Sequence, residues 1–246
     1  MGCRARFLLA GLTAFGVLGF ATPTPADSLA PPTSYKRVTP GEKFVFVMVS
    51  WIPVEDEVGR WNEETAAGIR EVRRTYTRSG MYRNDGSTDP LWTVDWYAYG
   101  VDLTPDGVHL IRPGPWARLL DDRTPDLDCE AVSFFANGRL IRTYHIRELV
   151  DDPGRFKRSV SHFSWREEGR VSGEFEYTIT TRDGNRFVFD IRTGAVVSEA
   201  RMGRVTWWGK RLALLVVGVL AAWLIYRRRS RKQRPGRSRP ASAPRA

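Results

Sequence analysis

The sequence contains very little cysteine and histidine for its length. Its 246 residues include two Cys and three His. Cys3 lies before an N-terminal apolar run of the kind that is removed on export, which leaves Cys129 in the mature chain, so no disulfide can form within it. A free cysteine usually behaves as a small buried hydrophobe, which is our interpretation of Cys129. The folded part must then be stabilised by its own core, and about 180 residues are enough for that.

The motifs of several large enzyme classes are also absent. The chain has no Gly-Lys-Ser/Thr phosphate loop, no paired Cys or His with zinc spacing, no Gly-x-Ser-x-Gly elbow and no dinucleotide fingerprint. We therefore expect no metal and no cofactor, and the sequence leans away from catalysis.

The central part of the chain carries no excess of positive charge. Residues 28–209 hold 25 basic and 27 acidic residues, whereas residues 210–246 hold 11 basic residues and no acid, so the net charge of +10 lies almost wholly at the ends. A nucleic-acid-binding domain carries its basic residues on the folded part. Nucleic acid is therefore not an expected partner.

Two apolar runs divide the chain. The first, 7–20, follows two arginines and precedes small residues and prolines, which is the order of a signal peptide. Its helical length of about 21 Å is short for a membrane crossing. Cleavage after Ala21 and cleavage after Ala26 both fit, and we assign 1–26 to the signal peptide.

The second apolar run, 212–226, predicts a transmembrane helix over 205–226; a buried soluble helix is the alternative. The residues expected to anchor it at the membrane surfaces are Trp207, Trp208, Lys210, Arg211, Arg227, Arg228 and Arg229. The basic tail, 227–246, stays in the cytoplasm by the positive-inside rule and can lie on anionic lipid. The predicted partners at this end are the lipid bilayer and anionic lipid, and the domain before the helix lies outside the cytoplasm.

The segment between the two runs reads as a Pro-rich lead-in, 27–42, followed by an exported β-rich domain, 43–204. The run 43–51 is apolar on both faces, which is typical of a central strand. Asn62 precedes two glutamates and apolar residues spaced by three and four, which predicts one amphipathic helix over 63–77.

From Leu91 onward the apolar residues alternate with a period of two. Asn137-Gly138, Asp183-Gly184 and residues 192–194 mark turns between such runs. We therefore predict a mainly β fold of antiparallel meander or propeller-blade-like sheets with one amphipathic helix and one C-terminal transmembrane helix. The patterns mark fewer than ten strands, too few for a closed propeller.

Several segments resemble known sequences. Residues 106–110 and 183–197 resemble pieces of propeller blades, and the longer segments 61–74, 82–101 and 131–151 resemble a family of uncharacterised exported, membrane-anchored bacterial proteins. The resemblance covers about residues 36–201. It implies export and anchoring, but no activity that would assign a role to a residue.

Aromatic residues are the first candidate for a binding site. Tyr97 and Tyr99 fall on the face opposite Trp92 and Trp96, so one set can be exposed, and Trp116 follows nearby. Rings of this kind serve protein and sugar recognition because they bury a large area at little entropic cost. Core packing is the alternative for all of them.

The histidines are the second candidate. His145 and His162 could meet across a sheet, with Asp95 or Glu148 nearby, as an acid/base pair or as metal ligands; ordinary surface or hydrogen-bonded histidines are the alternative. An acidic segment, 121–130, offers oxygens for calcium but lacks EF-hand spacing, and we interpret it as a solvated loop.

These observations predict a single-pass membrane-anchored protein whose extracytoplasmic β domain is a binding or interaction module. Its expected ligand is an unidentified extracytoplasmic protein or glycan. The alternatives are an envelope-associated hydrolase that uses His and carboxylate residues, and a structural component of the envelope.

Overall fold

The computed structural model of the protein describes residues 31–232, apart from the side chains at 203–207, 210 and 225–232. The predicted signal peptide, 1–26, and the tail beyond residue 232 lie outside the described residues.

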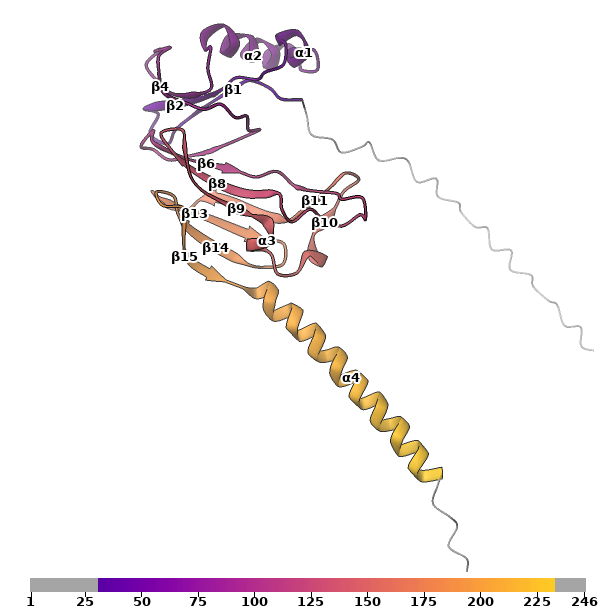
Figure 1. Cartoon of the computed structure of the whole chain (residues 1–246). Coiled ribbons are helices and arrows are strands. Elements are labelled where there is room, and N and C mark those ends of the chain that lie inside the picture. Colours follow the sequence, from indigo (N-terminus) through magenta and orange to yellow (C-terminus); the bar gives the residue numbers. More distant parts are fainter. Residues whose placement is uncertain (1–30, 233–246) are drawn as a thin grey trace, which may run out of the picture.

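Three four-stranded antiparallel sheets are stacked in the order of the sequence (Figure 1). The first sheet contains β1 (Tyr35–Val38), β2 (Phe44–Met48), β3 (Gly80–Arg83) and β4 (Pro90–Thr93). The second contains β5 (Asp102–Leu103), β6 (His109–Pro113), β8 (Glu130–Ala136) and β9 (Arg139–His145). The third contains β12 (Arg166–Val171), β13 (Glu176–Thr181), β14 (Arg186–Asp190) and β15 (Ala195–Ala200).

A smaller sheet and a few helices complete the domain. The smaller sheet has the order β10 (Lys157–Arg158), β11 (His162–Ser164), β7 (Ala117–Arg118). The helices are α1 (Val54–Val58), α2 (Glu63–Thr75), α3 (Ile146–Leu149), the 3-10 turn η1 (Pro153–Arg155) and α4 (Met202–Lys232). The prediction of a mainly β fold with antiparallel sheets and few helices is confirmed.

Strand β8 of the second sheet is buried on both faces, because its successive residues face different layers. Phe134 packs against Tyr177 and Phe189 of the third sheet, with ring centroids 6.2 and 5.3 Å apart. Its neighbour Phe135 points to the opposite side and packs 4.8 Å from the ring of Trp96, in the cluster shared with the first sheet. The uninterrupted apolar run in β8 thus fills two cores at once.

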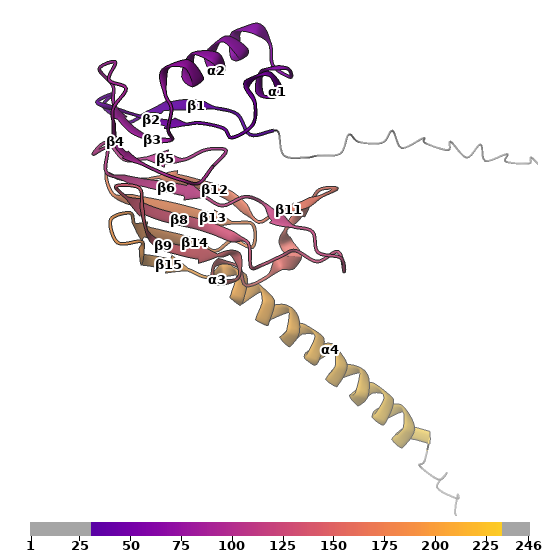
Figure 2. The ribbon, with the colours of Figure 1, turned by 45° about the horizontal axis from the view of Figure 1, so that its top comes forward.

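Helix α2 covers the outer face of the first sheet, while α4 leaves from the other end of the stack (Figure 2). The side chain of Asn62 accepts a hydrogen bond from the Thr65 amide at 2.9 Å, the N-cap that the sequence predicts. Val72 is buried against Val45 and Tyr82. The helix ends at Thr75, two residues before the predicted end, so its prediction is confirmed apart from that boundary.

The predicted hairpin turns are confirmed. Asn137 and Gly138 have φ values of 48° and 76°, the left-handed pair that a two-residue turn between twisted strands requires. Gly194 has φ 65°, and the Asp190 carboxylate accepts a hydrogen bond from the Arg192 amide at 3.0 Å. Local residue chemistry is enough to specify both turns.

Four predictions about strands differ from the structure. The described residues hold fifteen strands rather than fewer than ten, and β1 lies inside the predicted lead-in 27–42. Of the strands that were missed, β5, β7 and β10 have two residues, β3 has four, and β1 and β12 are polar edge strands with little apolar alternation. The alternation after Leu91 does not continue as a strand either, since β4 ends at Thr93, and β2 ends at Met48 rather than at residue 51.

Helix α4 extends over 31 residues, about 46 Å at 1.5 Å per residue. Arg201 ties its beginning to the domain: the guanidinium donates to the Glu148 carbonyl at 3.1 Å and lies 5.0 Å from the ring centroid of Phe187. Each large apolar side chain from 212 to 224 is at least 51% exposed. Over the described residues, no helix combines the length and the apolar character that a membrane crossing requires.

Only some of the residues expected to anchor α4 can be placed. Trp208 and Arg211 lie on the helix and are exposed. The side chains of the others lie outside the described residues: Trp207, Lys210, Arg227, Arg228 and Arg229.

Candidate functional site

Trp51, Tyr97 and Tyr99 form an aromatic surface on the first layer. The rings of Trp51 and Tyr97 meet edge to face, with centroids 5.0 Å apart and an interplanar angle of 88°. Those of Tyr97 and Tyr99 meet in the same way at 5.3 Å and 88°. Trp51 is 68% exposed and Tyr99 50% exposed, while Tyr97 is half-buried between them. Two of the predicted site residues therefore adjoin, and Trp51 joins them.

Tyr97 holds this surface in place through the segment that precedes β1. Its hydroxyl accepts a hydrogen bond from the Thr33 amide at 2.8 Å and donates to the Thr33 carbonyl at 3.0 Å. Burial raises the pKa of the Tyr97 hydroxyl, so the group stays neutral and keeps both bonds. The rings are thus ordered before any ligand arrives, which lowers the entropic cost of binding.

A buried ion pair supports the loop that carries Trp51. The Glu57 carboxylate is fully buried and accepts a hydrogen bond from the Ser34 amide. The Arg73 guanidinium lies 3.8 Å from Glu57 and donates to the carbonyls of Ser50 and Ile52, on either side of Trp51. The largely buried Arg73 side chain thus lies between α2 and this loop, where its charge balances that of Glu57.

The third predicted aromatic residue, Trp116, stacks on a predicted histidine. The rings of Trp116 and His162 are 3.9 Å apart and within 9° of parallel. The His162 Nδ1 atom lies 3.0 Å from Ser159 Oγ. His162 is buried and Trp116 is 40% exposed, so Trp116 covers the imidazole. The pairing of β11 with β7 creates this contact and places Trp116 apart from the aromatic surface.

His145 has a structural role at the start of α3. Its amide donates to Glu148 Oε2 at 2.7 Å, and its Nδ1 lies 2.7 Å from the Asp128 carbonyl oxygen. His145 ends β9 in the second sheet, whereas His162 belongs to β11 in the smaller sheet. The two predicted partners thus have different neighbours, and within the described residues no group of three or more His, Cys, Asp or Glu is arranged to hold a metal ion.

The remaining histidine forms a close pair in the β5–β6 turn. His109 Nδ1 lies 2.6 Å from Asp106 Oδ2. Burial alone would raise the pKa of Asp106. Hydrogen bonds from the Thr104 hydroxyl and from the amides of His109 and Val108 outweigh that effect, so the pKa lies below its ordinary value. The pair stabilises the turn that the Thr-Pro-Asp-Gly sequence predicts.

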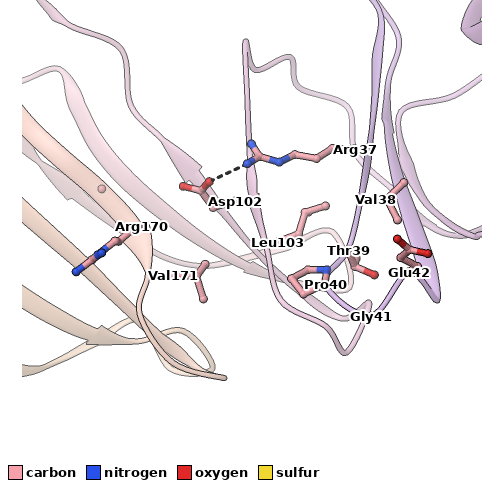
Figure 3. Close-up of a pocket in the computed structure, with 11 residues that line it drawn as sticks. Arg37, Val38, Thr39, Pro40, Gly41, Glu42, Asp102, Leu103, Arg170 and Val171 are labelled. Atoms are coloured by element: carbon pink, nitrogen blue, oxygen red, sulfur yellow. Dashed lines mark ion pairs between the residues drawn. The ribbon is translucent and has the colours of Figure 1, made fainter.

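A groove of about 670 Å³ opens where the three stacked sheets end on one side. We call it the edge groove; it is lined by residues 37–42, Asp102, Leu103 and residues 169–171. These residues come from β1 and its following turn, from β5 and from β12, which are the edge strands of the first, second and third sheets. Figure 3 shows Arg37 and Asp102 pointing toward each other across the groove.

Asp102 connects all three layers at this groove. Its carboxylate lies 3.6 Å from the Arg37 guanidinium of the first sheet and accepts a hydrogen bond from the Tyr177 hydroxyl of the third sheet at 2.9 Å. Arg37 also donates to the Val101 carbonyl at 2.6 Å. Burial raises the pKa of Tyr177, and the adjacent Asp102 charge raises it further, so the tyrosine remains a hydrogen-bond donor.

Sequence reasoning missed Trp51 and the edge groove for different reasons. Trp51 closes an apolar run that predicts a buried strand, but β2 ends at Met48 and Trp51 lies in a bend with its side chain exposed. The groove is assembled from three short segments far apart in the chain, so no local pattern marks it. The alignment of the three edge strands is the signal, and it exists only after the sheets have stacked.

Comparison of the chain with protein-family models, with curated proteins and with solved structures yielded no match. The function is therefore inferred from the geometry of this chain alone.

Proposed function

We propose that the protein is a single-pass, membrane-anchored binding module whose β domain lies outside the cytoplasm and captures a protein or glycan through the aromatic surface. The observation that carries the proposal is the pair of exposed rings, Trp51 and Tyr99, held at right angles to Tyr97. Trp51 is exposed and so contributes little to the core, and the buried ion pair that fixes its loop is costly to desolvate. This arrangement favours a role in binding over a role in stability.

The chemistry of the rings fits a recognition surface. Tryptophan and tyrosine dominate the energetics of protein interfaces because they bury a large area with few rotatable bonds. The support from Glu57 and Arg73 reaches the backbone on both sides of Trp51 and therefore limits the motion of its loop. A partner would thus meet a pre-ordered apolar surface with hydroxyl groups at its border.

Membrane attachment through α4 is supported by apolar side chains that the described part of the chain leaves uncovered. The uncharged run 212–226 measures about 22 Å, so the proposed span also needs the flanking residues from Trp207, with Lys210 and Arg211 reaching toward head groups. Several of those side chains lie outside the described residues. The basic tail after residue 226 would remain in the cytoplasm on anionic lipid.

Topology can be tested by labelling single cysteines with a membrane-impermeant maleimide. We expect Thr88→Cys, on an exposed loop, to be labelled in intact cells after the outer layers are made permeable, and Ser242→Cys to be labelled only when the inner membrane is opened. Cys129 is buried in the domain, and unmodified protein gives its background signal. Labelling of Ser242→Cys before the inner membrane is opened would contradict the proposed orientation.

The binding role can be tested by cross-linking the full-length protein in its native membrane. We expect Trp51→Ala and Tyr99→Ala each to reduce capture of a specific partner by more than about tenfold, the effect of losing a central aromatic contact. Trp61→Ala is the matched control, since Trp61 is 42% exposed but belongs to no part of the aromatic surface. Equal loss in the control, or unchanged capture in both test variants, would contradict the proposal.

A further inference from the structure

We propose that the edge groove is a second binding site, which takes an extended polypeptide segment of a partner protein as an additional strand beside β1. This inference goes beyond the aromatic surface and does not depend on it. The groove residues come from the edge strands of three sheets, and an edge strand carries backbone donors and acceptors that have no partner strand.

Hydrogen-bond positions show which backbone groups point into the groove. In an antiparallel pair, opposed residues alternate between hydrogen-bonded and non-hydrogen-bonded positions. The Thr39 amide donates to the Phe44 carbonyl at 2.9 Å, so the next pair, Val38 with Val45, is non-hydrogen-bonded. The N–H and C=O of Val38 therefore point away from β2, and those of Lys36 do the same two residues earlier.

The opposite wall of the groove has the same character. The Ser172 amide donates to the Glu176 carbonyl at 2.9 Å, which makes Val171, opposite Tyr177, a non-hydrogen-bonded position. Its backbone groups point outward from β12. In Figure 3, Val171 lies across the groove from the 39–42 turn, and Arg170 points away from the groove. A strand beside β1 would thus find backbone partners on one side and apolar contacts on the other.

The backbone groups of Lys36 and Val38 form the free edge of β1. Exposed edges are commonly blunted by a lysine side chain that discourages pairing. The Lys36 ammonium instead lies 3.2 Å from the Glu71 carboxylate of α2, on the outer face of the first sheet. Val38, the residue nearest the groove, is apolar and 44% exposed. Four of the six residues of β12 are charged, compared with two of the four in β1, and we therefore assign the added strand to β1.

An extended peptide fits this site better than a compact ligand. A strand repeats every two residues over about 6.6 Å, which matches the spacing of the outward groups of Lys36 and Val38. Side chains of the added strand would alternate between the α2 side and the groove, where the half-buried Val171 offers apolar contact. The peptide would carry no proline at the alternate positions whose amides donate to β1, because proline has no N–H to donate.

The test uses a phage-displayed library of random linear dodecapeptides, panned on the full-length protein in nanodiscs. We expect enriched peptides whose affinity for Val38→Pro is lower by about tenfold or more, the cost of losing one main-chain donor and the space beside it. Val38→Ala keeps the amide and retains binding. Leu140→Pro is the matched control: Leu140 is 58% exposed on the edge strand β9, next to the hydrogen-bonded hairpin pair, so its amide also points outward.

A second measurement keeps the test decisive if Val38→Pro does not fold. Backbone N-methylation of the best peptide, one residue at a time, should weaken binding at every second position, because only alternate amides face β1. Failure to enrich any peptide, equal binding to Val38→Pro, equal loss in Leu140→Pro, or a methylation profile without this alternation would each overturn the proposal. Trp51→Ala should leave peptide binding unchanged, which separates this site from the aromatic surface.

Discussion

The contact of Tyr177 with Asp102 predicts a measurable loss of stability when the hydroxyl is removed. Tyr177 is fully buried in the core between the second and third sheets, and its hydroxyl donates to a carboxylate at 2.9 Å. Hydrogen bonds to charged groups contribute about 1.5–3 kcal/mol. Tyr177→Phe should therefore lower the free energy of unfolding by about that amount, while Arg37→Gln, which breaks a half-exposed ion pair, should cost about 1 kcal/mol or less.

A second substitution shows whether this hydroxyl occupies the place that the structure assigns to it. A Cβ atom added at Gly169 would lie 2.7 Å from the Tyr177 hydroxyl oxygen, a distance that forces one of them to move. Gly169→Ala should therefore destabilise the protein by about 1–3 kcal/mol in the native background. The cost should shrink in the Tyr177→Phe background, because the atom that causes the clash is gone.

Urea denaturation of the four proteins in this cycle measures the effect, with midpoints compared at constant slope. The pKa of Tyr177 is raised in the folded state, so its contribution to stability is complete below pH 10 and is lost as the pH rises above that. Native protein should thus lose stability above pH 10 more steeply than Tyr177→Phe. Additive costs for Gly169→Ala and Tyr177→Phe, or a Tyr177→Phe variant as stable as the native protein, would refute this reasoning.

Three further predictions concern local structure. Because the pKa of Asp106 is lowered in the folded state, its contribution to stability is present above about pH 4 and is lost on acidification. The urea midpoint of Asp106→Asn should therefore lie below that of the native protein at pH 6 and converge with it near pH 2. A difference in midpoint that stays constant with pH would contradict this. Gly138→Ala should lower the free energy of unfolding by more than about 2 kcal/mol, since the backbone is left-handed and the new Cβ would lie 2.4 Å from the Thr93 carbonyl oxygen. Gly86 is also left-handed but lies in open space, so Gly86→Ala is the control and should cost about half as much. Asn62→Ala should cost about 1 kcal/mol in urea through loss of the α2 cap, and a change below about 0.3 kcal/mol would count against it.

Elements whose signals are local could be predicted closely. The cap of Asn62 and the apolar spacing after it place α2, since both act within one or two turns of helix. The pair Asn137-Gly138 specifies its hairpin because both residues tolerate a left-handed backbone. The alternation around Tyr177 and Phe187 likewise predicts β13 and β14 of the third sheet.

Elements that depend on distant partners were not accessible in this way. The polar strands β1 and β12 form because a neighbouring strand supplies their hydrogen bonds, and their own residues carry little period-two signal. His162 meets Trp116, and not His145, because β11 pairs with β7, from which it is separated by more than forty residues of the chain. Trp51 is exposed because the chain turns after Met48, which a run of apolar letters does not reveal.

The sequence by itself determined the β character of the domain, its turns, its one long amphipathic helix and the uneven distribution of charge along the chain. These features follow from backbone preferences and side-chain periodicity over a few residues. Only the tertiary structure decided the order of the three layers, the meeting of Trp51 with Tyr97 and Tyr99, and the edge groove with Asp102 at its centre. The physical reason is that stacking joins residues through burial of their faces, and burial depends on which sheet lies opposite rather than on which residue comes next.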